Sequence, residues 1–116
     1  EILRAAGIIT RLAFANEISL ANRLKRFLEP FKERFGSSAD RKRLIRSIVD
    51  TRNYLTHYDP ESEHKSADGR PLWVLCEKME ALLQLYFLKT LTFSDEQIAA
   101  VCDGSESLKR KLTLKL

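Results

Sequence analysis

Hydrophobic residues recur at helical spacing along most of the chain, and this pattern predicts an all-α fold. Intervals of three and four residues separate the apolar positions within residues 18–28, 44–55 and 72–88, as expected when one face of a helix is buried. No sustained alternation with a period of two occurs before the C-terminal stretch, so a sheet is not expected. We therefore expect an antiparallel helical bundle of about four to six helices.

Breaks in this pattern set the expected boundaries in the first half of the chain. One helix is expected within residues 1–14 and another over about residues 17–28. Pro30 then ends the second helix, kinks it, or starts a short continuation. A Gly-Ser-Ser connector follows, in which Ser38 is placed to cap a helix over residues 39–57.

The second half begins with a polar loop over residues 59–70, after which Pro71 suits the first turn of a long helix that ends near Leu91. Its larger apolar stripe comprises Leu72, Leu75, Met79, Leu82, Leu83, Tyr86 and Phe87, and a thinner one Val74, Ala81, Leu85 and Leu88. A helix that is apolar on two faces lies at the centre of a bundle or shares one face with a partner.

Two shorter segments complete the chain. A helix is expected over residues 95–102, because Ser94 and Gln97 form a capping box before it and Gly104 is placed to end it. The tail from Ser105 to Leu116 is basic and rich in leucine. This tail is either a last helix or a frayed end.

Length and composition indicate one folded domain over residues 1–116. Apolar residues make up 44% and charged residues 31% of the chain, which argues against disorder, and no apolar run is long enough to cross a membrane. The sequence starts at Glu1 without a signal-peptide pattern, so we expect the C-terminal part of a longer protein. The net charge of +4 mildly favours anionic partners.

The two cysteines and the histidines offer no metal site. Cys76 and Cys102 have no CxxC spacing, and His64 has no ligand partner at metal spacing. Each cysteine lies within a helical pattern, so we expect two buried free thiols in a reducing cytoplasm. No sequence motif for a cofactor is present, and none is expected.

The most specific motif is Arg-Asn-Tyr-Leu-Thr-His over residues 52–57. At about 100° per residue, five apolar side chains lie within about 80° of Arg52, so its guanidinium is expected to project from the middle of a buried apolar stripe. The members of that stripe are Leu44, Ile45, Ile48, Val49 and Leu55. A guanidinium there either reaches the edge of the stripe, is held for an anion, or forms an ion pair with Asp50, Glu77 or Glu80. Asn53 and His57 are four residues apart and share one flank of the helix.

The segment over residues 49–59 resembles the signature of the Apea-like group of HEPN domains, in which an Arg and a polar residue precede a His within a helical bundle. The likeness extends more loosely over residues 17–91, and Arg52, Asn53 and His57 match all three motif positions. The resemblance implies a homodimer that joins two motifs. It also implies a metal-independent RNA endonuclease acting in a toxin or anti-phage system. Other members of the family have lost the motif and only bind.

RNA cleavage is chemically plausible for these residues, because RNA carries its own nucleophile, the 2′-OH. His57 suits proton transfer near neutral pH, Arg52 suits phosphate oxygens, and Asn53 suits orienting the imidazole or holding a phosphate. One His cannot easily serve as both acid and base, which a two-fold dimer would solve. Arg52 and His57 point about 140° apart in an ideal helix, so a dimer seam or an unwound last turn must bring them together.

Several neighbouring residues have either a supporting role or none. A basic cluster follows an RNA backbone or is a solvated face; its members are Arg41, Lys42, Arg43 and Arg46. Asp50 and Tyr58 flank the motif. They either contact and position the motif residues or have no role in the site. The alternative to an enzyme is a non-catalytic module that binds RNA or nucleotide or dimerises. A further possible partner is an antitoxin or the remainder of a longer parent protein.

Overall fold

The described chain is built from helices alone, which confirms the all-α prediction. The computed structural model describes residues 2–58 and 60–116. Its elements in chain order are α1 (Ile2–Leu28), the 3₁₀ helix η1 (Glu29–Arg34), α2 (Ser38–His57), α3 (Pro60–Glu63), α4 (Gly69–Thr90), α5 (Asp95–Gly104) and α6 (Glu106–Thr113). No described helix is both long and apolar enough to cross a membrane.

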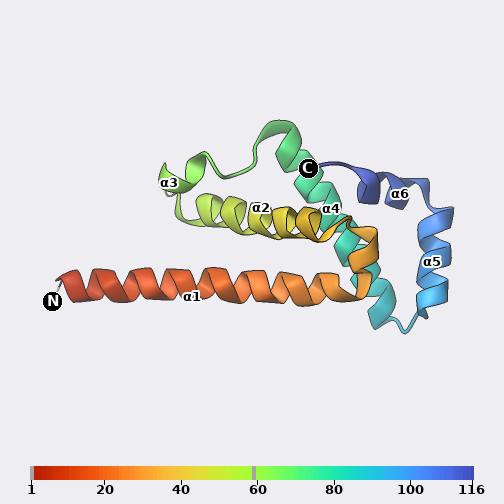
Figure 1. The fold of residues 1–116 in the computed structure, drawn as a ribbon, viewed down its shortest axis with the longest axis horizontal. Coiled ribbons are helices and arrows are strands. Elements are labelled where there is room, and N and C mark those ends of the chain that lie inside the picture. Colours follow the sequence, from red (N-terminus) through yellow and green to blue (C-terminus); the bar gives the residue numbers. More distant parts are fainter. Residues whose placement is uncertain (1, 59) are drawn as a thin grey trace.

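The arrangement is elongated because α1 is long. With 27 residues, α1 is about 40 Å long at a rise of 1.5 Å per residue, and the whole molecule measures 58 × 30 × 22 Å. Figure 1 shows α2 running antiparallel to α1. Helix α4 crosses this pair near the C-terminal end of α1 and the N-terminal end of α2, and α5 and α6 lie beyond the crossing. The C-terminal end of α2 therefore lies beside the N-terminal half of α1, away from the crossing.

The prediction of two helices before Pro30 is wrong, because α1 is continuous through the expected break. No Pro or Gly occurs between residues 14 and 17. Ala15 favours a helix, and Asn16 lowers helix propensity too little to end one. Pro30 lies in the first turn of η1, which was one of the three alternatives. Its fixed φ suits that position.

The start of α2 is capped by Ser37. The prediction that Ser38 caps this helix is wrong. The Ser37 hydroxyl accepts a hydrogen bond from the Asp40 backbone N–H at 3.2 Å, and the Ser37 N–H donates to Asp40 Oδ2 at 2.9 Å. The backbone hydrogen bond from Ser37 lowers the pKa of Asp40 below its ordinary value. Gly36 makes this approach possible: its φ is +85°, and a Cβ there would lie 2.6 Å from Asp40 Oδ2.

Replacing Ser37 with Ala is expected to destabilise the protein by about 1 kcal/mol, because the first turn of α2 loses its side-chain acceptor. For a chain of this size the thermal midpoint falls by about 4 °C. Ser38→Ala is the matched control and leaves the midpoint nearly unchanged, since Ser38 makes no capping bond. Circular dichroism melts of the two variants measure this, and equal shifts would contradict the assignment of the cap.

Helix α2 is buried on two sides. Leu44 and Ile48 belong to the core that α4 completes, while Val49 lies beside α1 in the wall of a cavity. These three residues are buried as the sequence predicts. Leu55 was expected in the same stripe, but it is 53% exposed because it lies at the end of α2 that α4 does not reach (Figure 1).

The buried face of α4 combines the thinner of its two stripes with Leu75 and Leu82 of the larger one, which are 2% and 5% exposed. Val74, Ala81 and Leu85 are at most 1% exposed. Most of the larger stripe faces outward, and its exposed members are Met79, Leu83, Tyr86 and Phe87. Of the two readings of a helix with two apolar faces, this exposure favours a surface shared with a partner.

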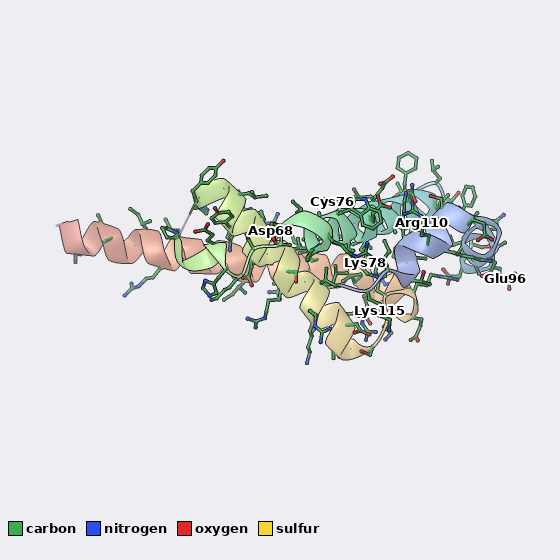
Figure 2. The ribbon with its side chains drawn as sticks, turned by 90° about the horizontal axis from the view of Figure 1, so that it is seen from above. Asp68, Cys76, Lys78, Glu96, Arg110 and Lys115 are labelled. Atoms are coloured by element: carbon green, nitrogen blue, oxygen red, sulfur yellow. The ribbon has the colours of Figure 1, made fainter. Side chains whose placement is uncertain are left out.

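Polar atoms join α4 to the C-terminal helix. Lys78 is only 8% exposed, and its Nζ donates to the Leu112 carbonyl at 3.1 Å, on the side of α4 shown in Figure 2. Burial lowers the pKa of this lysine. Lys111 pairs with Glu80 at 2.9 Å. The basic tail is therefore a docked helix, α6, and not a frayed end.

The remaining predictions in this half are mixed. Ser94 and Gln97 form the expected capping box, and α5 ends at Gly104, two residues later than the pattern indicated. Cys102 is buried, and burial raises the pKa of its thiol. The prediction for Cys76 is wrong, because this free thiol is exposed on the outer side of α4.

Candidate functional site

The motif occupies the last turns of α2, where Arg52 and His57 are both exposed and Asn53 is 8% exposed. The expectation that Arg52 projects from the middle of a buried stripe is wrong. In angle, Arg52 lies between the side of α2 that faces α4 and the side that faces α1. At this end of α2 the crossing helix is absent (Figure 1), and the Arg52 side chain is exposed to solvent.

Arg52 is not held by the acidic residues of α4 that the sequence offered as partners. Glu77 pairs with Arg110 at 3.4 Å and Glu80 pairs with Lys111. Among the described residues, Arg52 takes part in no ion pair. Its guanidinium charge is therefore available to an anion from outside the domain.

A hydrogen bond connects two residues of the motif. Arg52 Nη1 donates to Asn53 Oδ1 at 3.1 Å. Asn53 and His57 share a flank of α2 because they are four residues apart, whereas Arg52 starts from another side of the helix. The bond draws the guanidinium around the helix toward the flank of Asn53, and the burial of Asn53 fixes the acceptor. Asn53 thus has a geometric role beside the charge and the imidazole.

Thr51 is a structural residue of the site that the sequence analysis did not identify. It is 4% exposed, and its Oγ1 accepts a hydrogen bond from the Ala67 N–H at 2.9 Å. This bond ties the segment before α4 to the buried side of α2, one residue before Arg52. A threonine inside a helix gives no sequence signal for a contact 16 residues away.

The two residues expected to flank the motif lie apart. Tyr58 ends α2 in the left-handed conformation, with φ of 51°, and its ring is 71% exposed and packs edge-on to Tyr54, with 6.1 Å between centroids. Asp50 is half-buried and lines the cavity between α1 and α2. Within the described chain, no hydrogen bond, ion pair or ring contact joins either residue to Arg52 or His57, so their supporting role stays a prediction.

The last turn of α2 keeps its helical form. Residues 52–57 are α-helical, and the backbone N–H of Tyr58 donates to the Tyr54 carbonyl at 2.7 Å. Of the two ways to bring Arg52 and His57 to one phosphate, an unwound turn is therefore not what the structure adopts. The other way, a dimer seam that joins two motifs, stays a prediction.

Exposed apolar side chains gather at this same end of the molecule. Ile18 and Asp50 line one cavity, and α1 and α2 run antiparallel from there. Leu12 lies about 9 Å from Ile18 along α1, and His57 lies about 10 Å from Asp50 along α2. Both lie toward the same end of the molecule. The motif-end patch consists of Ile8, Ile9, Leu12, Leu55 and Tyr58, each at least half exposed. At about 100° per residue, Leu12 starts from the side of α1 opposite Ala21, which faces α2 across the cavity, so the patch extends around α1 and does not close over the motif. Exposed apolar surface of this kind is typical of a protein interface.

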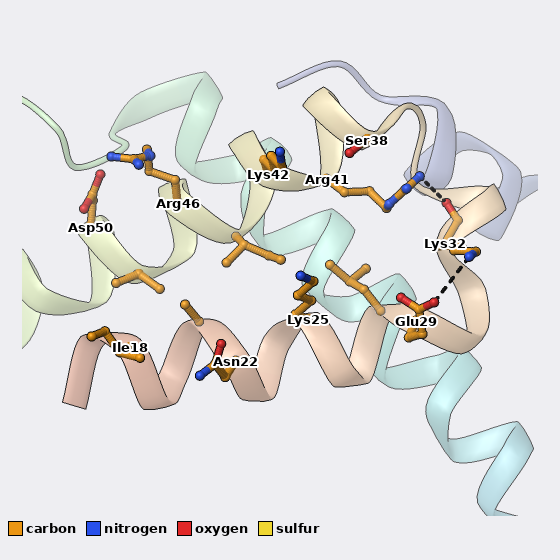
Figure 3. Close-up of a pocket in the computed structure, with 14 residues that line it drawn as sticks. Ile18, Asn22, Lys25, Glu29, Lys32, Ser38, Arg41, Lys42, Arg46 and Asp50 are labelled. Carbon is orange, nitrogen blue, oxygen red and sulfur yellow. Dashed lines mark hydrogen bonds and ion pairs between the residues drawn. The ribbon is translucent and has the colours of Figure 1, made fainter. Parts of the chain in front are cut away.

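A basic cavity of about 510 Å³ lies between α1 and α2, and Figure 3 shows its lining. Its lining contains five cationic side chains and two carboxylates. The cations are Lys25, Lys32, Arg41, Lys42 and Arg46, and the acids are Glu29 and Asp50. Three residues of the basic cluster predicted from the sequence therefore lie together here. The sequence analysis did not select Lys25, because its proximity to α2 depends on how α1 pairs with it.

Two of the five cations are already engaged. Arg41 Nη1 donates to the carbonyl oxygens of Gly36 at 2.7 Å and Lys32 at 3.3 Å, and Lys32 pairs with Glu29 at 3.3 Å. Within the described chain, Lys25, Lys42 and Arg46 have no ion pair. Arg43, the fourth member of the predicted cluster, lies instead in a second cavity of about 350 Å³ beside Asp40, Lys78 and the C-terminal tail.

The described residues contain no group of three or more His, Cys, Asp and Glu side chains that could hold a metal ion. His64 is exposed, away from any such group.

Comparison with known protein families gives a match over most of the chain. A family model described as Apea-like HEPN matches residues 4–97, which includes α1, α2 and α4 and all of the motif. No curated protein and no solved structure matches the chain.

Proposed function

Because the chain belongs to the Apea-like HEPN family, we propose that it is a metal-independent RNA endonuclease domain whose motif residues are Arg52, Asn53 and His57. The observation that carries the proposal is the exposure of Arg52 and His57 at the end of α2, with Arg52 outside any ion pair of the described chain. A motif kept only for packing would be buried. An exposed cation beside an exposed imidazole is instead available to a phosphate.

The proposed reaction is attack of the RNA 2′-OH on the adjacent phosphorus. The bond from O2′ to phosphorus forms and the bond from phosphorus to O5′ breaks, which leaves a 2′,3′-cyclic phosphate and a free 5′-OH. His57 accepts the proton of the 2′-OH, and His57 of the partner subunit donates a proton to the leaving O5′. Arg52 stabilises the charge that builds up on the phosphate oxygens.

This division of labour requires two copies of the chain. One domain offers one motif histidine, and the helical last turn keeps Arg52 and His57 about 140° apart. The motif-end patch, which is apolar, exposed and at the same end of the molecule as the motif, supports a two-fold interface there. Two chains joined there would place both histidines at one seam. A domain that stays monomeric would fit the alternative, a module that binds RNA without cutting it.

The wider role we propose is that of an effector in a toxin or anti-phage system that acts on cytoplasmic RNA. The C-terminal half of α4 lies away from the motif end of α2 in Figure 1, and its Leu83 and Phe87 are more than 60% exposed. It suits a protein partner, either an antitoxin or the remainder of a longer parent protein. The three members of the basic cluster that line the cavity between α1 and α2, Arg41, Lys42 and Arg46, suit the RNA backbone.

The experiment that tests the function is cleavage of a labelled single-stranded RNA in EDTA by the protein and by Arg52→Ala. We expect the variant to cleave about 10²–10³ times more slowly, because one positioned donor group contributes about 3–4 kcal/mol to the transition state. Arg52→Lys should recover only part of the rate, since it keeps the charge and loses the planar fork. Equal rates for Arg52→Ala and the unmodified protein, or no cleavage in EDTA, would contradict the proposal.

A further inference from the structure

We propose that the cavity between α1 and α2 binds the RNA strand beside the cleaved bond, through phosphates that lie along α2 before the motif. The inference rests on the proposed function, and it adds a second contact region on a different part of the domain. Its size, its charge and its position on the helix carry the argument.

The size and lining of the cavity fit a phosphate backbone. About 510 Å³ is within the range of sites that bind small organic groups. Its floor is formed by aliphatic residues, among them Ile45 and Val49, and none of the described residues that line it is aromatic. Base stacking, which needs aromatic side chains, is therefore not offered by this lining, while cations are abundant. We expect contacts with phosphates that depend little on base sequence.

The charge is available and is held on two helices. Lys25 comes from α1, and Lys42 and Arg46 come from α2 (Figure 3). All three are exposed, and none has an ion pair within the described chain. Arg41 is anchored to two backbone carbonyls, so it holds the turn before α2 in place and adds a fixed positive charge at the end of the cavity.

The cavity is also aligned with the motif. At about 100° per residue, Lys42, Asn53 and His57 all lie within about 40° of the direction of Arg46 around α2. His57 is about 17 Å further along the helix than Arg46. Along this side of α2, the exposed cations Lys42 and Arg46 come first, and the exposed imidazole of His57 comes last. The amide of Asn53 lies between them and is buried. A strand whose scissile phosphate lies at His57 can continue along this face into the cavity.

The test is the salt dependence of RNA binding in a His57→Ala background, where the strand stays intact. The triple variant Lys25→Gln, Lys42→Gln, Arg46→Gln is compared with Arg43→Gln, which removes a cation of the same helix that faces the other cavity. The probe is a labelled single-stranded RNA of mixed sequence. Because the exchanged side chains are exposed, circular dichroism should confirm an unchanged fold.

We expect the triple variant to bind about tenfold or more weakly, and the slope of log Kd against log salt to fall by about 2, since each phosphate contact on a single strand contributes about 0.7. Arg43→Gln should keep the slope of the parent. An unchanged slope in the triple variant, or an equal loss in Arg43→Gln, overturns the inference. Cleavage by the native protein is read separately: a protein that does not cleave but shows this pattern supports the strand site and refutes the nuclease.

Discussion

Replacing His57 with Ala is expected to reduce RNA cleavage by about 10²–10⁴-fold, the usual contribution of a positioned acid or base. The imidazole is exposed at the end of α2 and takes part in no hydrogen bond or ion pair with the described residues, so the variant should fold normally. In a symmetric dimer the substitution removes the acid and the base together. The loss should therefore be at the upper end of this range.

The matched control is His64→Ala, which removes the other histidine of the chain. His64 is also exposed and lies in the segment between α3 and α4, so any general effect of losing an imidazole should appear in both variants. Initial rates on a labelled single-stranded RNA, measured in EDTA, give the comparison. A His57→Ala protein as active as His64→Ala would remove the imidazole from the mechanism.

The second large effect is expected from Leu12→Glu, which places a charge in the motif-end patch. Leu12 is 60% exposed, so the substitution should not disturb the folded monomer. A buried, unpaired carboxylate at the centre of an apolar seam is costly, and we expect the dimer to dissociate. Because each phosphate needs both histidines in this account, cleavage should be lost with the dimer even though the motif is untouched.

Leu83→Glu is the control for this prediction. Leu83 is 61% exposed and lies on the outer stripe of α4. The two leucines are therefore equally exposed but belong to different surfaces of the domain. Sedimentation or light scattering measures the mass, and the same samples are assayed for cleavage. A dimer that survives Leu12→Glu, or that dissociates in Leu83→Glu, would place the seam elsewhere and contradict this geometry.

Local signals in the sequence predicted most of the helices, because they act between near neighbours. The capping box of Ser94 and Gln97 and the stop at Gly104 are of this kind. The start of α2 shows the limit of such signals. Ser37 and Ser38 are both acceptable caps, and the choice depends on Asp40 being three residues after Ser37 and on the positive φ of Gly36.

Burial was harder to predict, because it depends on which helices cross and where. On α4 the two apolar stripes left open which residues enter the core. Leu75 and Leu82 of the larger stripe are buried together with Ala81 and Leu85 of the thinner one, while Leu83 and Phe87 are exposed. Arg52 and Leu55 were expected in a buried stripe of α2. Both are exposed, because α4 crosses α2 nearer its other end (Figure 1).

The candidate site was predictable in its chemistry and not in its extent. The spacing of Arg52, Asn53 and His57 identified the family that the family model confirms. The bond from Arg52 to Asn53 and the anchor at Thr51 depend on side-chain packing that no spacing encodes. Lys25 joins the basic cavity only because α1 and α2 run antiparallel, a long-range fact that lies outside any local pattern.

The central claim is that two motifs form one cleavage centre, and a defined heterodimer tests it most directly. A chain with native His57 and a His57→Ala chain, carrying different affinity tags, are produced together, and the mixed dimer is isolated through both tags. Its rate of RNA cleavage in EDTA is compared with that of the native dimer. We predict a loss of about 10²-fold or more, because the seam then lacks either the acid or the base. A mixed dimer with about half the native rate would mean that each motif works alone, and would contradict the account.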